Sequence, residues 1–368
     1  MKKVRVGLIG AGAWTVASHL PNLARRADEL EFVGVNNHDM ERLDLIQRQY
    51  GFQVASLDDR EVLASGVDVC VVASPARWHH EHASAALEAG AHVLVEKPFT
   101  IDPADAWDLT NTAKRLGLHL LVAFGANYQP MLRGAKHLMT TDGGIGEVEH
   151  VTIHMASAIR EAFLGHPRPY ALDGLPEDAP ELHSDPHTSA DPELSGGGYA
   201  QAQLSHAIGL ALWLIGLRGS EVYGATWRPS PKVPVEFHDA AVVVFDNGAI
   251  GTISGGSCHI GAGNNKHQQV VRLIGSAGQL HVDVEREIVW RYRGPDDSVR
   301  MPLKDGDGVY DCRGPIDALI DLAAGRAVLN ASPGELGARV VEIVDALYRS
   351  AELHAPVGIP DDSVQKKP

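Results

Sequence analysis

The first 125 residues alternate short apolar runs with helical segments, and this alternation constrains the fold more than any other feature of the chain. Such runs are typical of strands buried on both faces of a sheet. Strands that alternate with helices form a parallel sheet with right-handed crossovers. Six strands of this kind predict a doubly wound α/β domain over residues 1–125. The clearest runs span 4–9, 31–35, 67–73, 91–95 and 118–124, the last being the sixth strand.

A glycine-rich loop follows the first strand. Gly10 and Gly12 let the backbone turn tightly and approach a pyrophosphate at the N-terminus of a helix expected to start near Val16. Thr15 stands where this kind of loop usually has its third glycine, so we expect the helix to pack slightly further from the strand. A plain turn between strand and helix is the alternative for this pattern alone. The predicted cofactor contacts here are Gly10, Gly12, Ala13 and Trp14.

The end of the second strand bears on the choice between NAD and NADP. A carboxylate there holds a ribose diol, and an arginine holds a 2′-phosphate. Asn37 occupies this position, and no arginine or lysine follows it before Arg42. A neutral amide can bond a hydroxyl but leaves a buried phosphate dianion unpaired. The sequence therefore favours NAD, with NADP as the alternative.

The tripeptide Glu96-Lys97-Pro98 follows the apolar run 91–95, about 85 residues after the glycine loop. Ligands of an open parallel sheet bind outside the carboxyl ends of its strands, and proline ends the strand at this point. A lysine there is a compact cation whose pKa falls on burial, so it can transfer a proton. An ordinary surface lysine is the alternative for the tripeptide in isolation.

Size, charge and cysteine usage exclude several classes of protein. A chain of 368 residues predicts two domains, and its formal net charge of −15 argues against nucleic acid as a partner. No apolar run approaches the roughly 18 residues needed to span a bilayer. Cys70, Cys258 and Cys312 lack the spacing of a metal site, which fits a reducing cytoplasm.

The pattern changes after residue 125, and we expect an α+β domain over 126–360 with a disordered tail at 361–368. An alternating strand at 148–158 precedes a long polar segment at 159–194. An apolar helix at 199–217 follows three glycines and carries Gln203 and His206. Further strands are predicted near 223–227, 240–245, 249–255, 268–274, 279–284 and 288–292, and closing helices at 316–323 and 333–353.

Two groups of histidines raise the question of a metal. His79, His80 and His82 open a helix without the i, i+4 spacing of zinc helices, so polar or cofactor contacts are favoured. His183 and His187 flank Asp185 in the polar segment, where ordinary loop contacts are again favoured. We therefore predict no metal.

Taken together, these motifs resemble the glucose–fructose oxidoreductase/inositol dehydrogenase (Gfo/Idh/MocA) family. The resemblance rests on the ordered set of the glycine loop, Ser74-Pro75 with His79, Glu96-Lys97-Pro98, and Gly196-Gly197-Gly198 with a histidine eight residues on. It implies a Rossmann domain followed by a large open mixed sheet, one face of which often forms contacts between copies. It also implies a homodimer or homotetramer that transfers a hydride between NAD and a secondary alcohol of a sugar, glycoside or cyclitol.

The resemblance assigns roles to particular residues. Lys97 matches the lysine that contacts the reacting hydroxyl, and His206 matches the catalytic histidine. Many members have an aspartate four residues before that histidine, whereas this chain has Ala202, and Gln203 shares a helix face with His206. Further cofactor contacts are predicted at Ser74, Pro75, His79, Glu96 and Lys97. Predicted substrate contacts are Lys97, Tyr128, Arg160, Arg168, His187, Gln203 and His206.

Two points stay open at the level of sequence. Either Lys97 or His206 can take the hydroxyl proton. A redox-neutral, NAD-dependent glycosidase, working by transient oxidation, elimination, water addition and re-reduction, is the alternative to a dehydrogenase.

Overall fold

The computed structural model describes residues 2–166, 169–170, 182–185, 187–258 and 267–360. The chain divides into two compact units. The first unit comprises 1–125, 165–196 and 311–338, and the second comprises 126–164, 197–310 and 339–368. Residues 165–196 and 311–338, which the sequence placed in the second domain, therefore cluster with the first unit.

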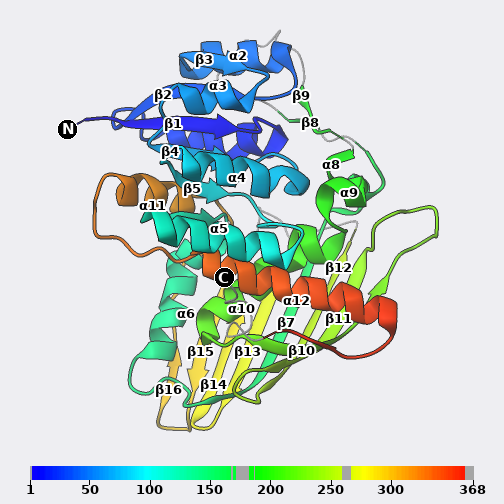
Figure 1. Cartoon of the computed structure of the whole chain (residues 1–368). Coiled ribbons are helices and arrows are strands. Elements are labelled where there is room, and N and C mark those ends of the chain that lie inside the picture. The colour runs from blue at the N-terminus through cyan, green and yellow to red at the C-terminus, as the bar shows by residue number, and fades with distance from the viewer. Residues whose placement is uncertain (1, 167–168, 171–181, 186, 259–266, 361–368) are drawn as a thin grey trace. The chain divides into compact units, whose positions relative to one another are not determined.

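The first unit is built on a parallel six-stranded sheet of order β3-β2-β1-β4-β5-β6, flanked by helices (Figure 1). This order confirms the predicted doubly wound fold. The strands are β1 (Val4–Ile9), β2 (Leu30–Asn36), β3 (Val54–Ser56), β4 (Val69–Val72), β5 (His92–Val95) and β6 (Leu120–Val122). The longer helical elements are η1 (Thr15–His19), α1 (Leu20–Ala24), α2 (Met40–Tyr50), α3 (Asp59–Ala64), α4 (His79–Glu88), α5 (Pro103–Leu116) and α11 (Arg313–Ala323).

Capping residues set where several helices of this unit begin and end. The side chains of Asp39, Asp58 and Asp102 accept a hydrogen bond from the first turns of α2, α3 and α5. Gly51 and Gly117 end α2 and α5 in the left-handed conformation. These caps fix the helix lengths, so each following strand returns to the sheet in register.

Ion pairs explain why α11 belongs to the first unit although it lies near the end of the chain. Arg26 donates to Asp317 at 3.1 Å and to Asp321 at 2.8 Å, both on α11. The backbone N–H of Val122 at the end of β6 donates to Ser332 O at 2.8 Å. The late segment thus extends the packing around the parallel sheet.

The second unit contains a nine-stranded sheet of order β16-β15-β14-β13-β7-β12-β11-β10-β17. β7 and β12 are parallel, and the other neighbours are antiparallel, so the sheet is mixed as expected. Its strands are β7 (Val148–Ser157), β10 (Gly219–Trp227), β11 (His238–Phe245), β12 (Ile250–Ser257), β13 (Gln268–Gly275), β14 (Gly278–Asp283), β15 (Ile288–Tyr292), β16 (Ser298–Arg300) and β17 (Val357–Gly358).

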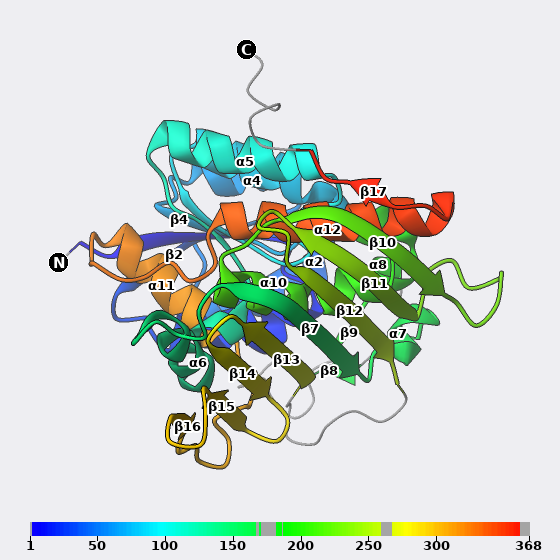
Figure 2. The ribbon, with the colours of Figure 1, turned by 90° about the horizontal axis from the view of Figure 1, so that it is seen from below.

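Helices cover one face of this sheet (Figure 2). α10 (Ser205–Ile215) packs against β7 and β13, and α6 (Pro130–Thr140) packs against β14 and β15. The side chains of Val151, Ile153 and Met155 on β7 are buried on this face. We call the other side of the sheet the open face. The remaining helical elements of the unit are most of η3 (Gly125–Tyr128), α7 (Arg160–Phe163), η4 (Ala200–Leu204) and the part of α12 (Gly334–Leu353) from residue 339.

Several local predictions differ from the structure. The first helical run starts at Ala13 and not near Val16, because its first turns include the five-residue π-helix η1. The helix predicted at 199–217 is the π-helix η4 followed by α10. The polar segment at 159–194 contains α7, α8 (His187–Ala190), α9 (Pro192–Ser195) and a two-stranded ladder of β8 (Pro169–Tyr170) and β9 (Leu182–His183). Arg168 and the predicted tail 361–368 lie outside the described residues.

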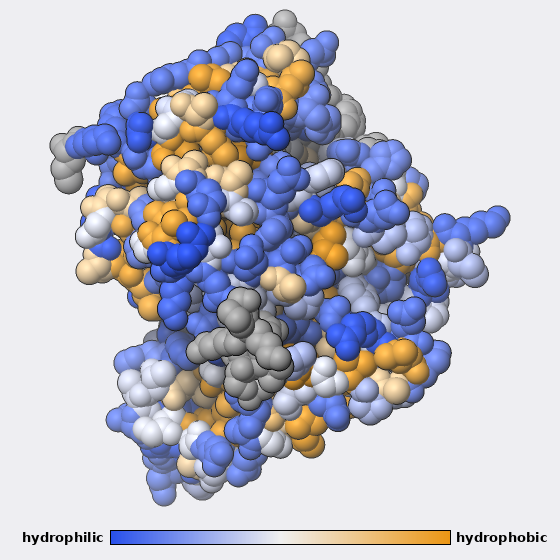
Figure 3. Space-filling model, viewed as in Figure 1, coloured by the Kyte–Doolittle hydropathy of each residue, from blue (hydrophilic) through white to orange (hydrophobic). Residues whose placement is uncertain are grey.

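The surface seen in Figure 3 is mostly hydrophilic, with smaller hydrophobic areas between the charged residues. Among the described residues, no helix has the length and apolar character to cross a membrane.

Candidate functional site

The glycine loop after β1 has the backbone geometry of a ligand cradle. Gly10 has φ +88°, and a Cβ there would lie 2.3 Å from Ser74 N, so only glycine fits. A Cβ at Gly12 would meet nothing within 4 Å, which leaves open space beside the loop. Buried Thr15 donates from Oγ1 to Gly10 O at 2.8 Å and thereby fastens the loop. The position of the usual third glycine thus carries a side chain that holds the turn.

Glu96 joins the glycine loop to the carboxyl end of β5. Its Oε1 accepts from Trp14 Nε1 at 2.8 Å and lies 2.8 Å from His19 Nε2, while Oε2 accepts from Lys97 N at 2.9 Å. Burial alone would raise the pKa of Glu96, but the hydrogen bond with His19 and the charges of His19 and Lys97 outweigh it and lower the pKa. The carboxylate is therefore ionised, and its oxygens serve to hold protein groups in place.

Lys97 follows directly and lies at the carboxyl end of β5, as predicted. Burial lowers the pKa of its ammonium group, while the charge of Glu96 and the thiol of Cys312 act in the opposite direction. A lysine with a lowered pKa can accept a proton near neutral pH more readily than an exposed one.

His79 ties the loop after β4 to the loop after β5. Its Nε2 lies 2.7 Å from Ser74 O, and its Nδ1 lies 2.8 Å from Pro98 O. Burial lowers the pKa of His79, although these carbonyl oxygens favour the charged form. His82 Nδ1 lies 2.9 Å from Ser74 Oγ, so two histidines hold the Ser74-Pro75 turn. The histidine cluster therefore shapes the sheet edge where a cofactor is predicted.

Asn37 is buried at the end of β2, as the sequence predicted for the ribose position. Its Oδ1 accepts from Asp39 N at 2.9 Å, and the Asp39 carboxylate accepts from Arg42 N at 3.2 Å. The amide thus shapes the turn that leads into α2.

In the second unit, His206 lies in the first turn of α10 and is 4% exposed. Its ring makes edge contacts with His267 and Tyr310, at centroid distances of 5.5 and 5.4 Å. The rings of His267 and Tyr310 stack at 4.5 Å. We call these three residues the ring cluster. His267 and Tyr310 escaped the sequence prediction because neither belongs to a motif, and His267 only precedes a predicted strand.

The start of the helical run that carries His206 is anchored by a buried carboxylate. Glu236 accepts from Gly198 N at 2.9 Å, from Ala200 N at 3.1 Å and from Tyr348 Oη at 2.7 Å. A Cβ at Gly197 would lie 2.3 Å from Tyr348 Oη, and one at Gly198 would lie 2.1 Å from Glu236 O. Gly197 and Gly198 therefore let the backbone approach the Tyr348 side chain and the Glu236 backbone closely.

The remaining predicted substrate contacts lie at several places. In the second unit, Arg160 lies over the ring of Phe237 at 5.1 Å, and Tyr128 and Gln203 are half-buried. In the first unit, His187 is exposed, with its backbone N–H bonded to Asp185. Within the described ranges, no three His, Cys, Asp or Glu side chains are grouped closely enough to hold a metal ion.

A parallel sheet of this order, with a positive-φ glycine loop opening a helix, defines a dinucleotide-binding domain. The description "Oxidoreductase family, NAD-binding Rossmann fold" matches residues 4–124, and "GFO/IDH/MocA C-terminal domain" matches residues 134–281. These two matches together cover most of the chain. The protein belongs to the Gfo/Idh/MocA family of NAD-binding oxidoreductases, as its motifs predicted.

Two curated relatives that resemble this chain carry dehydrogenase names. The chain is 33% identical over 147 residues to D-glucoside 3-dehydrogenase of Escherichia coli, which covers 39% of this chain and 41% of that protein. It is 30% identical over 254 residues to 1-carboxy-3-chloro-3,4-dihydroxycyclo hexa-1,5-diene dehydrogenase of Comamonas testosteroni, covering 68% of this chain and 57% of the relative. The chain thus aligns with about half the length of these relatives.

Solved structures share the whole fold. Levoglucosan dehydrogenase, in complex with NADH and levoglucosan, superposes with a TM-score of 0.75 over 98% of this chain and 100% of that chain, at 22% identity. The cradle described here fits the same class of cofactor. Open space at Gly12 and the helix that begins at Ala13 suit a pyrophosphate.

Proposed function

We propose that this protein is an NAD-dependent dehydrogenase that oxidises a secondary alcohol of a sugar, glycoside or cyclitol. The observation that carries the proposal is Lys97, a lysine of lowered pKa at the carboxyl end of β5, linked through Glu96 to the glycine loop. A dinucleotide cradle and a proton-transfer group thus share one edge of one sheet. The dehydrogenase names of the relatives support the reaction class.

In the proposed reaction, NAD held at the glycine loop would supply the acceptor for the hydride of the carbinol carbon. Lys97 takes the hydroxyl proton, and its cationic form then stabilises the oxygen as negative charge develops there. In the second unit, His206 is the alternative proton acceptor, and the rings of His267 and Tyr310 hold it in orientation. Since Ala202 supplies no carboxylate to fix the imidazole, the ring cluster takes over that orienting function.

Glu96 and Trp14 act as positioning residues in this proposal. The Glu96 carboxylate holds the Lys97 backbone and the Trp14 indole at once. We propose that the cofactor contacts are backbone groups of the glycine loop, Asn37, and the Ser74-Pro75 turn.

The test is NADH formation, followed at 340 nm, with NAD and a panel of sugars, glycosides and inositols. A sustained rise with one of these alcohols supports the proposal, and silence across the panel contradicts it. Aglycone release that requires NAD without net NADH would instead select the glycosidase alternative, which the dehydrogenase names of these relatives do not favour.

We also propose that copies of the chain associate through the apolar part of the open face. Large apolar side chains are exposed there on β10, β11 and β12. Their exposed fractions are 50% for Tyr223, 51% for Trp227, 48% for Val242 and 52% for Ile250. Light scattering after size exclusion should report a dimer or tetramer, and Trp227→Glu should shift it towards the monomer.

A further inference from the structure

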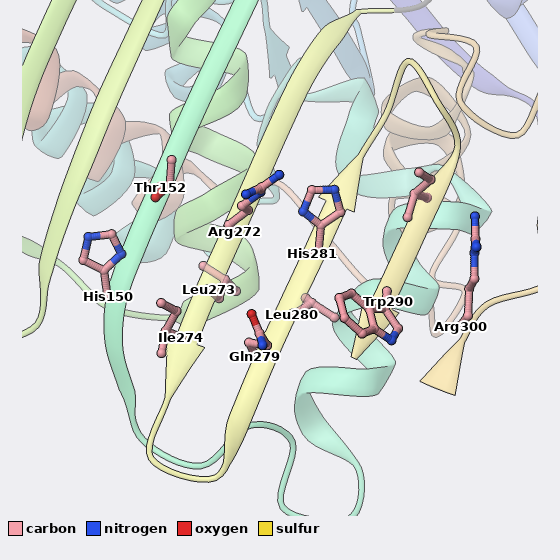
Figure 4. Close-up of a pocket in the computed structure, with 11 residues that line it drawn as sticks. His150, Thr152, Arg272, Leu273, Ile274, Gln279, Leu280, His281, Trp290 and Arg300 are labelled. Carbon is pink, nitrogen blue, oxygen red and sulfur yellow. The ribbon is translucent and has the colours of Figure 1, made fainter. Parts of the chain in front are cut away.

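The other half of the open face, on β7 and β13–β16, has a different chemical character. Strand register aligns five side chains there in one row across the sheet. Thr152 pairs with Arg272, Arg272 with His281, His281 with Trp290, and Trp290 with Arg300. The four strands from β13 to β16 are about 4.8 Å apart, so the two arginines lie on strands about 14 Å apart. These side chains project from neighbouring strands (Figure 4). They help to line a hollow of about 680 Å³.

The charge of the hollow is opposite to that of the chain. Its lining includes the cations Arg272 and Arg300 and no carboxylate, whereas the protein has a net charge of −15. Within the residues the structure describes, neither the Arg272 nor the Arg300 side chain forms an ion pair or a hydrogen bond. Guanidinium groups without a protein partner are suited to bidentate binding of phosphate or carboxylate.

Trp290 adds a flat apolar surface to the row, between His281 and Arg300. Its Nε1 donates to Ser298 Oγ at 2.7 Å, and its ring lies 5.4 Å from that of Tyr292, so the indole is held in place. A fixed indole between two cationic side chains suits a ring compound that carries an anionic group. The volume of the hollow is within the usual range for sites of small molecules.

The sheet separates this hollow from His206. α10, which carries His206, packs against the buried face of β7 and β13, and the row lies on the open face of the same strands. A ligand in the hollow is therefore not the substrate at the ring cluster.

We infer that the row Thr152–Arg272–His281–Trp290–Arg300 is a second ligand site, which binds a sugar-like ring bearing a phosphate or a carboxylate. The arginines bind the oxyanion, and Trp290 packs against the ring. This site is independent of the proposed dehydrogenase chemistry.

The test is calorimetric titration of the full-length protein, without NAD, by glucose 6-phosphate, glucuronate, inorganic phosphate and neutral glucose. We expect at least one of the two anionic sugars to bind at least tenfold more tightly than glucose and than inorganic phosphate, and to be displaced by sulfate. Comparison of glucose 6-phosphate with glucuronate shows whether the site prefers a phosphate or a carboxylate. Arg272→Gln and Arg300→Gln should each weaken binding at least tenfold, while Arg349→Gln, an exposed arginine on α12, should not change it.

Three results would overturn the inference. The first is absence of binding by both anionic sugars, or binding that the two arginine variants leave unchanged. The second is equal affinity for inorganic phosphate and the sugars, which removes the role of Trp290. The third is dissociation of the oligomer in Arg272→Gln, seen by light scattering, which would assign the row to a contact between copies. Because the titration uses neither NAD nor turnover, it can succeed or fail independently of the dehydrogenase assay.

Discussion

Trp14 donates a hydrogen bond from its indole Nε1 to Glu96 Oε1 over 2.8 Å, joining two motifs that lie 82 residues apart in the sequence. The same oxygen lies 2.8 Å from His19 Nε2, and the other carboxylate oxygen accepts from Lys97 N. One buried carboxylate therefore couples the shape of the glycine loop to the position of the lysine. Under the proposed function, binding of the cofactor and proton transfer depend on this common support.

Trp14→Phe tests this support, because it removes the indole donor and keeps an aromatic ring. Loss of one hydrogen bond to a charged group should lower the free energy of unfolding by ~1–2 kcal/mol. It should also weaken NAD binding severalfold, since the loop is held less firmly. Calorimetric melting and NAD titration measure both effects. Trp78→Phe, at an exposed tryptophan, is the matched control and should change neither quantity.

Lys97→Met removes the ammonium group and keeps most of the side-chain volume. Loss of a positioned proton acceptor typically costs 10²–10⁴ in rate, so we expect kcat to fall at least about a hundredfold. NAD affinity should stay within about threefold, because the cradle is formed by the glycine loop. Lys114→Met, an exposed lysine on α5, serves as control. Near-normal turnover in Lys97→Met would remove Lys97 from the site.

The ring cluster predicts a difference between two substitutions of Tyr310. Tyr310→Ala removes the stacking on His267 and the edge contact with His206, contacts worth ~0.5–1.5 kcal/mol each, so kcat should fall about tenfold. Tyr310→Phe keeps the ring and should retain most of the activity. The pH profile should shift in Tyr310→Ala because His206 loses its orientation. Equal losses in both variants would point to the hydroxyl.

The parallel sheet could be predicted because strands that are buried on both faces appear in the sequence as continuous apolar runs. Runs such as 91–95 consist almost entirely of apolar residues, and the structure confirms their order and direction. The packing of α11 on the first unit could not be predicted. It depends on Arg26 meeting Asp317 and Asp321, and charge pairs almost 300 residues apart leave no periodic signal.

Some residues of the candidate site could also be marked from the sequence, and their roles stay predictions. Gly10, Lys97 and His206 belong to local motifs, so the spacing of their neighbours along the chain is enough to mark them. His267 and Tyr310 meet His206 only through the fold of the second unit, and nothing in their neighbouring residues marks them. Glu96 was predicted as a cofactor contact, but its carboxylate oxygens accept hydrogen bonds from protein groups, which its motif alone did not reveal.

Asn37→Asp should sharpen the preference for NAD. Asn37 Oδ1 already accepts from Asp39 N, and an aspartate oxygen can keep this bond while adding a negative charge. That charge can accept from ribose hydroxyls and repels a 2′-phosphate. We expect the ratio of NADP to NAD dissociation constants to rise about tenfold, ~1.4 kcal/mol, in titrations of the apo-protein. A variant that binds NADP more tightly would show that Asn37 does not face the ribose.

Asp239→Asn should stabilise the protein at neutral and higher pH. Asp239 is 4% exposed, and burial together with the charge of nearby Glu236 raises its pKa well above the ordinary value. Burial also raises the pKa of Glu236, although the hydrogen bonds that it accepts act in the opposite direction. Burial likewise raises the pKa of Tyr348. Above about pH 4, an unfolded chain ionises Asp239 while the folded protein keeps it protonated. The folded state then binds more protons, so stability falls as pH rises through the folded pKa.

An asparagine at this position stays neutral at every pH and avoids that loss. In scans between pH 4 and pH 8, the melting temperature of Asp239→Asn should therefore start at or slightly below that of the natural protein, and should exceed it increasingly until the pH reaches the raised pKa of folded Asp239. Scanning calorimetry between these limits measures the difference, with Asp44→Asn at an exposed position of α2 as control. A loss of stability that is the same at all pH values would mean that Asp239 is ionised in the folded protein and acts as a hydrogen-bond acceptor.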